Sequence, residues 1–236
     1  MSEPFFDYIQ HNRKTVSNNL YGYEDAEKVY GRVTYQKLPE VSAPDIKLAD
    51  VLLKRQSTLR FGEENLTLVQ LSQLLRYSLA RNEQSQGVKK YPFPSGGGFY
   101  PIETYLLANK VSGLEPGVYH YKTVTHEIAK INGHSLNLEE VNNNYGCSFE
   151  TLPHVVLHMT MVKSRTIHKY GSLCYILSLL EAGHRGQNLC LCAAACDVGV
   201  RPMGGGKYEK INAMLDIDGM NEHHIYGLAI GTAPQA

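Results

Sequence analysis

Two runs of three glycines are the residues in this chain whose spacing first suggests chemistry. One run, Gly96–Gly98, lies in the stretch YPFPSGGGFYPIETYLL, and the other, Gly204–Gly206, lies in RPMGGGKYEK. Three consecutive glycines are costly to order, because glycine loses more backbone freedom on folding than any other residue. Bare main chain of this kind can lie against a flat ligand and offer it N–H and C=O groups. The sequence leaves two interpretations open: glycine-rich surface loops, or the seat of a planar cofactor such as isoalloxazine.

Neither run matches a standard nucleotide-binding motif. The first lacks the Lys-Ser/Thr pair with which a P-loop meets a phosphate and Mg²⁺. It also has Pro101 where a dinucleotide-binding fingerprint has its third glycine. The segment KRQSTLRF offers a different phosphate site, because Arg55, Ser57 and Arg60 supply positive charge and a hydroxyl group. Arginines in such a cluster are more often plain surface charges, so this segment alone is weak support.

The bulk composition is that of a globular protein. Hydrophobic residues make up 43% and charged residues 19% of the 236 positions. The 23 basic residues balance 23 acidic ones, so no basic field is available to attract nucleic acid. The opening MSEPFFDYIQHNRK is not a secretory signal, and no run has the length needed to span a bilayer. We therefore expect a cytoplasmic protein that binds neither nucleic acid nor membrane.

The five cysteines are interpreted as small buried side chains. Their odd number indicates a reducing compartment. In NLCLCAAAC a helix would place Cys192 and Cys196 on one face and Cys190 on nearly the opposite face. A metal site would need a CxxC pair or a histidine at ligand spacing, so we expect no bound metal.

The hydrophobic pattern predicts an α+β protein. Residues 1–45 are polar and tyrosine-rich and are interpreted as an N-terminal extension, followed by one domain over residues 46–236. A helix is expected to run into Arg55, and another begins at Thr67, with Gln70 at the capping-box position. Strands are expected at 102–109, 117–131, 154–162 and 223–232, the third of them central. A long helix is expected from 171 to a stop at Gly199, and a short one within 201–217. Helices and strands do not alternate regularly, which favours α+β over α/β.

Taken together, several of these segments resemble the nitroreductase superfamily, specifically the SagB-type dehydrogenase branch that includes azoline oxidases. The segments are RQSTLRF, LTLVQLSQLLRYSLA, PSGGGFYPIETYLLANKVSGLEPGVYHY, HKYGSLCYILSLLEAGHRGQNLCLCAAACDVGVRPMGGG and IYGLAIG. The likeness covers residues 50–232 well and residues 1–45 loosely. Its most specific marker is the run from Ser95 through Tyr100-Pro101-Ile102-Glu103 to the Gly-Leu-x-Pro-Gly turn.

The resemblance implies a homodimeric flavoprotein, with a mostly antiparallel sheet flanked by helices and one FMN at each end of the subunit interface. Arg55 and Ser57 match the phosphate-binding Arg-x-Ser of the family. Ser95, Gly96 and Gly97 match its ring-facing loop, and Gly204 and Gly205 match the backbone near the reactive flavin nitrogen. Lys169 and Tyr170 match the Lys-Tyr pair that azoline-oxidising members place beside the flavin.

The motifs also depart from the family pattern. Gly97-Gly98-Phe99 stands where Ala-Gly-Ala-Leu is commoner, and Gly206-Lys207 stands where Phe-Asp is frequent. The ending GTAPQA lacks the basic residues that many nitroreductases use on the FMN phosphate, so Arg201 or the partner subunit would have to compensate.

The leading hypothesis is an FMN-dependent dehydrogenase that oxidises a thiazoline or oxazoline in a peptide or related natural product. Lys169 would be the base, and Tyr170 would relay the proton or hold the substrate carbonyl. The first alternative is an NAD(P)H-dependent nitroreductase. The second is a non-catalytic flavin-binding scaffold that docks a cyclodehydratase. Its surface would be formed by tyrosines near the N-terminus, namely Tyr8, Tyr21, Tyr23, Tyr30 and Tyr35.

Overall fold

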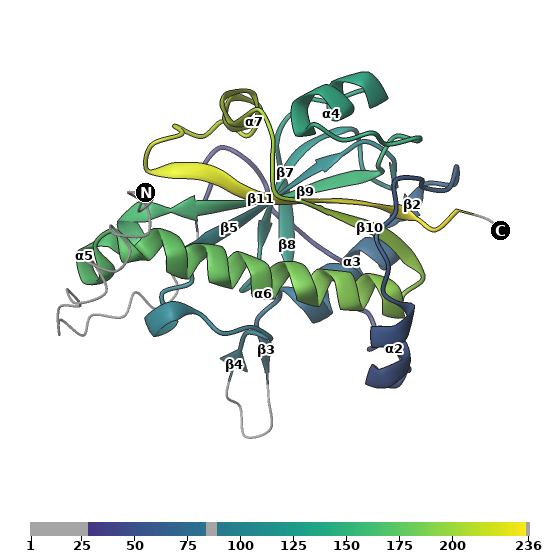
Figure 1. Cartoon of the computed structure of the whole chain (residues 1–236), viewed down its shortest axis with the longest axis horizontal. Coiled ribbons are helices and arrows are strands. Elements are labelled where there is room, and N and C mark those ends of the chain that lie inside the picture. The colour runs from purple at the N-terminus through teal and green to yellow at the C-terminus, as the bar shows by residue number, and fades with distance from the viewer. Residues whose placement is uncertain (1–27, 84–88, 235–236) are drawn as a thin grey trace, which may run out of the picture.

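One seven-stranded antiparallel sheet is the centre of the fold. The computed structural model describes residues 28–83 and 89–234 (Figure 1). The strand order is β1-β8-β7-β5-β9-β11-β10, and all neighbouring pairs are antiparallel. The strands of this sheet are β1 (Gln36–Lys37), β5 (Ile102–Ala108), β7 (Gly117–Lys122), β8 (Glu127–Asn132), β9 (Val155–Val162), β10 (Val198–Met203) and β11 (Glu222–Thr232). Two small pairs lie outside it: β2 (Leu66–Thr67) with β6 (Val111–Ser112), and β3 (Asn82–Glu83) with β4 (Lys89–Lys90).

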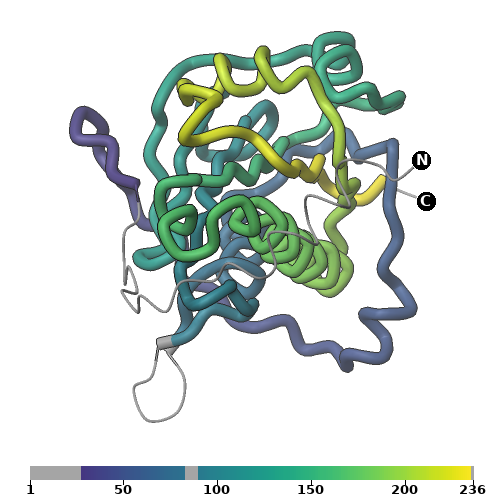
Figure 2. The backbone as a smooth tube through the Cα atoms, turned by 60° about the vertical axis from the view of Figure 1, so that its left-hand side comes forward, coloured from purple at the N-terminus to yellow at the C-terminus, as the bar shows by residue number. Residues whose placement is uncertain are grey.

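Helices cover both faces of this sheet. The helices α3 (Leu68–Ser78) and α6 (Leu173–Ala195) pack on one face, and α4 (Leu138–Tyr145) and α7 (Tyr208–Met214) pack on the other (Figures 1 and 2). Two short helices lie at opposite ends of α6, with α5 (Ile167–Tyr170) at its start and α2 (Leu48–Lys54) near its end. A mostly antiparallel sheet flanked by helices is the α+β architecture that the sequence predicted.

The central strands β5 and β9 are buried along their whole length. Because side chains alternate across a strand, Leu106 and Leu157 enter the core beneath α3 and α6, whereas Leu107 and Val156 enter the core beneath α4 and α7. This two-sided burial explains the nearly continuous apolar runs. It confirms the predicted strand at 154–162 and its central place between β5 and β11.

The predicted end of the first helix and the predicted start of the second are confirmed. The Thr67 Oγ1 accepts the Gln70 N–H at 3.1 Å, and the Gln70 Oε1 accepts the Thr67 N–H at 3.0 Å, which completes the capping box. Helix α2 ends at Lys54 with Arg55 as its C-cap. The first arginine of the candidate phosphate segment therefore stands where the helix ends.

The predicted helix stop at Gly199 is wrong. Helix α6 ends at Ala195, and the chain turns at Asp197, whose φ is +55°. Gly199 instead lies within β10, where an added Cβ would be 3.0 Å from the Thr58 Cγ2 and 3.3 Å from the Phe61 Cδ1. Close packing of this strand against the 58–61 segment, rather than helix termination, requires the glycine.

Other local differences have similar causes. The expected strand 117–131 is two strands, β7 and β8, which meet at a turn where His126 has a φ of +56°. Helix α4 was not predicted, although an Asn137–Glu140 capping box marks its start. Within the described residues, all five cysteines are free and no cluster of three or more His, Cys, Asp or Glu is suited to a metal.

Two of the five tyrosines in the proposed docking surface, Tyr30 and Tyr35, lie within the described residues, and for these two the prediction of an exposed surface is corrected. Tyr30 and Tyr35 are half-buried: the Tyr30 hydroxyl lies 3.2 Å from that of Tyr105, and the Tyr35 hydroxyl lies 3.0 Å from the His120 Nδ1. These two rings are packed against the sheet rather than offered to a partner. Tyr8, Tyr21 and Tyr23 lie outside the described residues. Among the helices that are described, none combines the length and apolar character needed to cross a bilayer.

Candidate active site

The first glycine run forms a single tight turn between Ser95 and Phe99. Gly97 and Gly98 have φ values of +65° and +73°, which glycine adopts without strain, and both are exposed. The Gly98 N–H donates to the Ser95 carbonyl at 3.1 Å. An added Cβ on Gly97 would overlap the Tyr170 hydroxyl and come within 2.9 Å of the Phe99 ring. The turn is therefore bare on its outer side and closely packed on its inner side.

Tyr100, the residue that leaves this turn, has a strained backbone. Its φ is +46°, a region that bulky residues rarely occupy. The Tyr100 N–H donates to the Ser95 Oγ at 2.9 Å, and its carbonyl accepts a hydrogen bond from the Arg165 Nη1 at 3.3 Å. Its ring packs on that of Tyr91, with 4.2 Å between the ring centroids. These contacts hold a conformation that Tyr100 would not adopt on its own.

The structure brings the predicted Lys-Tyr pair into contact with this turn. Lys169 and Tyr170 end the short helix α5, and both are half-buried. The Tyr170 ring meets the Phe99 ring edge-on at 5.9 Å, and the Lys169 Nζ lies 5.2 Å from the centre of the Phe99 ring. Two segments about 70 residues apart in sequence thus form one surface.

A buried ion pair on α6 lies behind the turn. The Arg185 Nε lies 3.4 Å from the Glu181 Oε1, and its Nη1 donates to the Ile102 carbonyl at 2.9 Å. Burial raises the pKa of the Glu181 carboxyl, and the charge of Arg185 and the Ser95 hydroxyl oppose this only in part. The sequence analysis missed this pair, although acidic and basic residues at i and i+4 in an apolar helix are a recognisable signal.

A second buried ion pair connects β5 to the segment before α5. The Arg165 Nη2 donates to the Glu103 Oε1, and the His120 Nε2 lies 2.8 Å from the Glu103 Oε2. Burial by itself would raise the pKa of Glu103, but the hydrogen bond to His120 and the charge of Arg165 outweigh it and hold that pKa at about 2. This network was also missed. A glutamate within the otherwise apolar strand IETYLLA is the signal that pointed to it.

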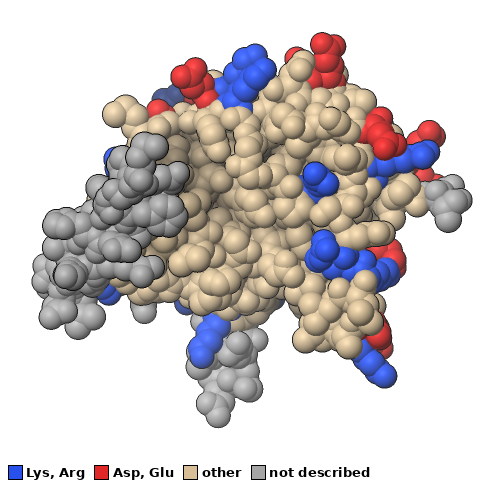
Figure 3. Space-filling view, in the orientation of Figure 1, with Lys and Arg blue, Asp and Glu red and all other residues tan. Residues whose placement is uncertain are grey.

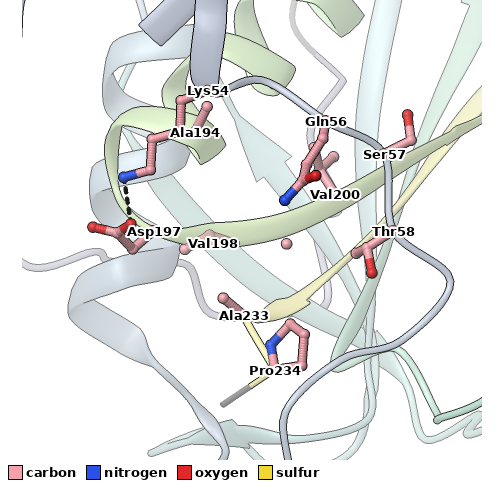
Figure 4. Close-up of a pocket in the computed structure, with 11 residues that line it drawn as sticks. Lys54, Gln56, Ser57, Thr58, Ala194, Asp197, Val198, Val200, Ala233 and Pro234 are labelled. Atoms are coloured by element: carbon pink, nitrogen blue, oxygen red, sulfur yellow. Dashed lines mark hydrogen bonds and ion pairs between the residues drawn. The ribbon is translucent and has the colours of Figure 1, made fainter. Parts of the chain in front are cut away.

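The predicted phosphate-binding residues lie elsewhere, near the end of α6. Ser57 is exposed and lines a cavity of about 260 Å³ with Ala194, Val200 and Ala233 (Figure 4). At one side of this cavity Lys54 forms an ion pair with Asp197. Arg55 is half-buried and directly precedes the cavity-lining residues Gln56–Thr58, while Arg60 is exposed. A cation and a hydroxyl are therefore present beside an open space.

The second glycine run continues from β10, the strand that borders this cavity. Gly204 and Gly205 are exposed, and an added Cβ on either would meet nothing within 4 Å. The Thr58 N–H donates to the Val200 carbonyl at 3.0 Å. Strand β10 therefore connects the candidate phosphate segment KRQSTLRF to the second glycine run. At about 3.3 Å per strand residue, Gly204 lies roughly 13 Å along the strand from Val200. The run is open main chain at the end of a fixed strand.

The structure does not bring all the predicted site residues together within this chain. Leu177 packs against Gly96 near the start of α6, whereas Ala194 and Ser57 line the same cavity near its end. Helical rise places 17 residues over roughly 25 Å, so the Ser95–Gly97 turn and the Arg55–Ser57 segment are far apart. That separation exceeds the length of the ribityl chain that joins ring to phosphate in FMN.

The chain matches a known family and known proteins. Residues 52–232 match the model of the nitroreductase family. A Methanocaldococcus jannaschii protein named "Putative nitroreductase MJ1384" is 32% identical over 185 residues, which cover 75% of this chain and 90% of that protein. The microcin B17-processing protein McbC of Escherichia coli is 30% identical over 114 residues, which cover 45% of this chain and 41% of McbC.

Solved structures agree on the fold. A crystal structure of a nitroreductase-like protein from Ralstonia eutropha has a TM-score of 0.72 at 23% identity, and the match covers 92% of this chain and all of that one. The Escherichia coli microcin synthetase McbBCD complex contains a chain with a TM-score of 0.67 at 18% identity, and the match covers 98% of this chain and 92% of that one.

The chain belongs to the nitroreductase family of oxidoreductases. Its sequence likeness to McbC over 114 residues agrees with the predicted SagB-type branch.

Proposed function

We propose that this protein is an FMN-dependent dehydrogenase that oxidises a thiazoline or oxazoline to the aromatic azole. The observation that supports this most directly is the contact of Lys169 and Tyr170 with the Ser95–Gly98 turn. An acid–base pair beside a bare glycine surface is the arrangement that proton removal next to a flat redox cofactor requires.

Residues on both glycine runs fit FMN, the cofactor that members of this family generally bind. Gly98 leaves one side of the first run open, and Gly204 and Gly205 present open main chain in the second, as a planar ring requires. Arg55 and Ser57 would hold the phosphate, since a guanidinium and a hydroxyl both donate hydrogen bonds to phosphate oxygens. Ser95, Gly96 and Gly97 would face the ring. Bound FMN would supply a hydride acceptor.

Lys169 would remove the proton in this dehydrogenation. Conversion of an azoline to an azole removes one hydride and one proton from adjacent carbons. The proton needs a base beside the ring, and Lys169 carries a basic nitrogen 5.2 Å from the centre of the Phe99 ring, next to the turn. Tyr170 would orient the substrate carbonyl or pass the proton on, because its hydroxyl lies against Gly97 of the turn.

A homodimer would complete the site. The Ser95–Gly97 turn and the Arg55–Ser57 segment are too far apart to hold one FMN within a subunit, so two subunits would each supply one part. The face that carries α6 is largely free of charged side chains at its centre (Figure 3). Exposed apolar side chains on α2 and α6 are Leu48, Leu52, Leu53, Tyr175, Leu179 and Leu180. Such a face usually marks an interface.

Two further parts of the proposal concern partners and location. The fold match with a chain of the McbBCD complex supports a role within a biosynthetic complex, with a cyclodehydratase as the partner that makes the azoline. The balanced charge and the odd cysteine count support a cytoplasmic protein.

An NAD(P)H-dependent nitroreductase is the alternative, and the 32% identity with the Methanocaldococcus jannaschii protein favours it. One pair of measurements separates the two functions. The FMN-loaded protein is incubated with a synthetic thiazoline peptide under O₂. Mass spectrometry of the product then shows whether the peptide has lost two hydrogen atoms. The same protein is mixed rapidly with NADPH. Azole formation without fast flavin bleaching supports the dehydrogenase, whereas fast bleaching without azole formation overturns it in favour of the nitroreductase.

A further inference from the structure

Arg165 lies between the Ser95–Phe99 turn and the Lys169–Tyr170 pair, the two segments that form the candidate active site. It ends the short turn Lys163–Arg165, directly before the helix that carries Lys169 and Tyr170. Its Nη1 donates to the Tyr100 carbonyl at 3.3 Å, and its Nη2 donates to the Glu103 carboxylate. One guanidinium therefore joins the residues that follow the glycine turn to the residues that precede the Lys-Tyr pair.

The Arg165 guanidinium is bound to the buried carboxylate of Glu103, which other contacts hold in place. The Glu103 side chain is 4% exposed, and that of Arg165 is 11% exposed. Glu103 also accepts the Lys28 backbone N–H at 2.9 Å and pairs with the fully buried His120. Because both carboxylate oxygens are engaged from different elements, Glu103 cannot follow Arg165 if that side chain moves.

The second contact of Arg165 holds a strained residue. Tyr100 keeps a φ of +46°, its N–H is bonded to the Ser95 Oγ, and its carbonyl is bonded to Arg165. Strained backbone persists only where surrounding contacts determine it fully. Loss of the Arg165 contact would let Tyr100 relax, and the Ser95–Gly98 turn would move with it through Ser95.

The same arginine sets the start of the Lys-Tyr segment. The Lys169 and Tyr170 N–H groups both donate to the Thr166 carbonyl, at 3.2 and 3.0 Å, and Thr166 directly follows Arg165. Movement of Arg165 would therefore shift both Lys169 and Tyr170.

We propose that Arg165 is the positioning residue that sets the separation between the ring-facing turn and the Lys169–Tyr170 pair. Arg165 acts through Tyr100 and Glu103 and does not itself touch substrate. This inference rests on the proposed function in one respect, namely that the turn faces a flavin ring.

Three variants of the full chain test the proposal: Arg165→Gln, Arg165→Lys and, as a matched control, Arg32→Gln at an exposed arginine outside both segments. The readouts are hydrogen exchange of the 95–103 and 163–171 peptides, and the visible circular dichroism of bound FMN. Arg165→Gln should speed exchange in both peptides roughly tenfold or more, because a charged hydrogen bond is lost. It should also change the dichroism while FMN content stays within about twofold of native.

Arg165→Lys should recover only part of the effect, since an ammonium group cannot bridge the two acceptors as a guanidinium does. If Arg165→Gln does not fold because the buried Glu103 carboxylate loses its guanidinium partner, the double variant Arg165→Gln/Glu103→Gln removes both charges and is measured instead. Native exchange in both peptides, together with native dichroism, would overturn the proposal. A wild-type protein that binds no FMN would overturn the proposed function, while the exchange measurement would still decide the role of Arg165.

Discussion

The hydroxyl of Tyr170 occupies the space into which a Cβ on Gly97 would project. The relationship joins two residues that the sequence analysis selected for different reasons, one as a flavin-facing glycine and one as part of a catalytic pair. Position 97 therefore requires glycine both for its positive φ and for the space that Tyr170 occupies. Gly97 leaves its outer side bare, and it leaves its inner side open to Tyr170.

Gly97→Ala is expected to disturb the site more than Gly98→Ala. Both positions have positive φ, which costs an alanine about 1 kcal/mol or more, but only Gly97 lacks room for a Cβ. The difference between their free energies of unfolding in urea therefore reports the overlap with Tyr170 and Phe99. Adding Tyr170→Phe to Gly97→Ala should restore part of the loss. Equal costs at the two glycines, with no restoration, would show that Tyr170 does not lie against Gly97.

Lys169→Ala is expected to retain FMN and to lose azoline oxidation by about 10²–10⁴-fold, the usual effect of a positioned acid–base group. Tyr170→Phe should lose less if the hydroxyl only orients the substrate, and a similar amount if it shares the proton transfer. Turnover of a synthetic thiazoline peptide and the isotope effect of a deuterium on its α-carbon distinguish these roles. A Lys169→Ala enzyme with native turnover would make the pair structural.

Arg55→Ala is expected to give folded protein that is largely colourless. A charged hydrogen bond to phosphate contributes roughly 1.5–3 kcal/mol, which corresponds to about one to two decades in Kd. The measurement is the flavin released on heating per mole of protein, with Arg32→Ala, at an exposed arginine outside the candidate phosphate segment, as the control. Full FMN occupancy in Arg55→Ala would remove this residue from the phosphate site.

Mixed dimers are expected to show that each site takes residues from two subunits. Arg55→Ala and Lys169→Ala chains are produced together with different tags, and the heterodimer is isolated. If the parts come from two chains, one of its two sites carries both defects and the other carries none, so about half of native activity should return. A heterodimer as inactive as both parents, yet dimeric in sedimentation, would show that both residues serve one site within a subunit.

The Glu103 carboxylate is expected to make folding stability depend on pH in acid. Its pKa is about 2 in the folded protein against an ordinary 4.5, so the unfolded chain binds the proton more readily. The stability contribution is complete above about pH 4.5 and is lost as the pH falls toward about 2, on the order of 3 kcal/mol in all. Urea unfolding at several pH values should give a shallower acid slope for Glu103→Gln. Glu115→Gln, at the exposed pair with Lys130, is the control and should change the slope little.

Local patterns predicted the elements whose formation depends on neighbours in the chain. The Thr67–Gln70 capping box involves residues three positions apart, and the apolar run of β9 reflects burial on both faces. The wrong prediction of a helix end at Gly199 arose because a tertiary contact, and not a neighbour in the chain, requires this glycine. A glycine after a helix usually ends it, but here close packing against Thr58 and Phe61 is the reason for the glycine, and no local pattern carries that contact.

The sequence by itself determined the family and the α+β class, and it predicted which residue types would serve a flavin site. These follow from short motifs, because capping, burial and bare glycine turns are encoded within a few residues. Only the tertiary structure decided which candidate residues meet. It packed Tyr170 against Gly97 and left Arg55 and Ser57 near the far end of α6. It also joined Arg165 to Glu103 and Tyr100, which lie 62 and 65 positions away in the chain. Such distances are set by how strands and helices pack, and spacing along the chain does not contain them.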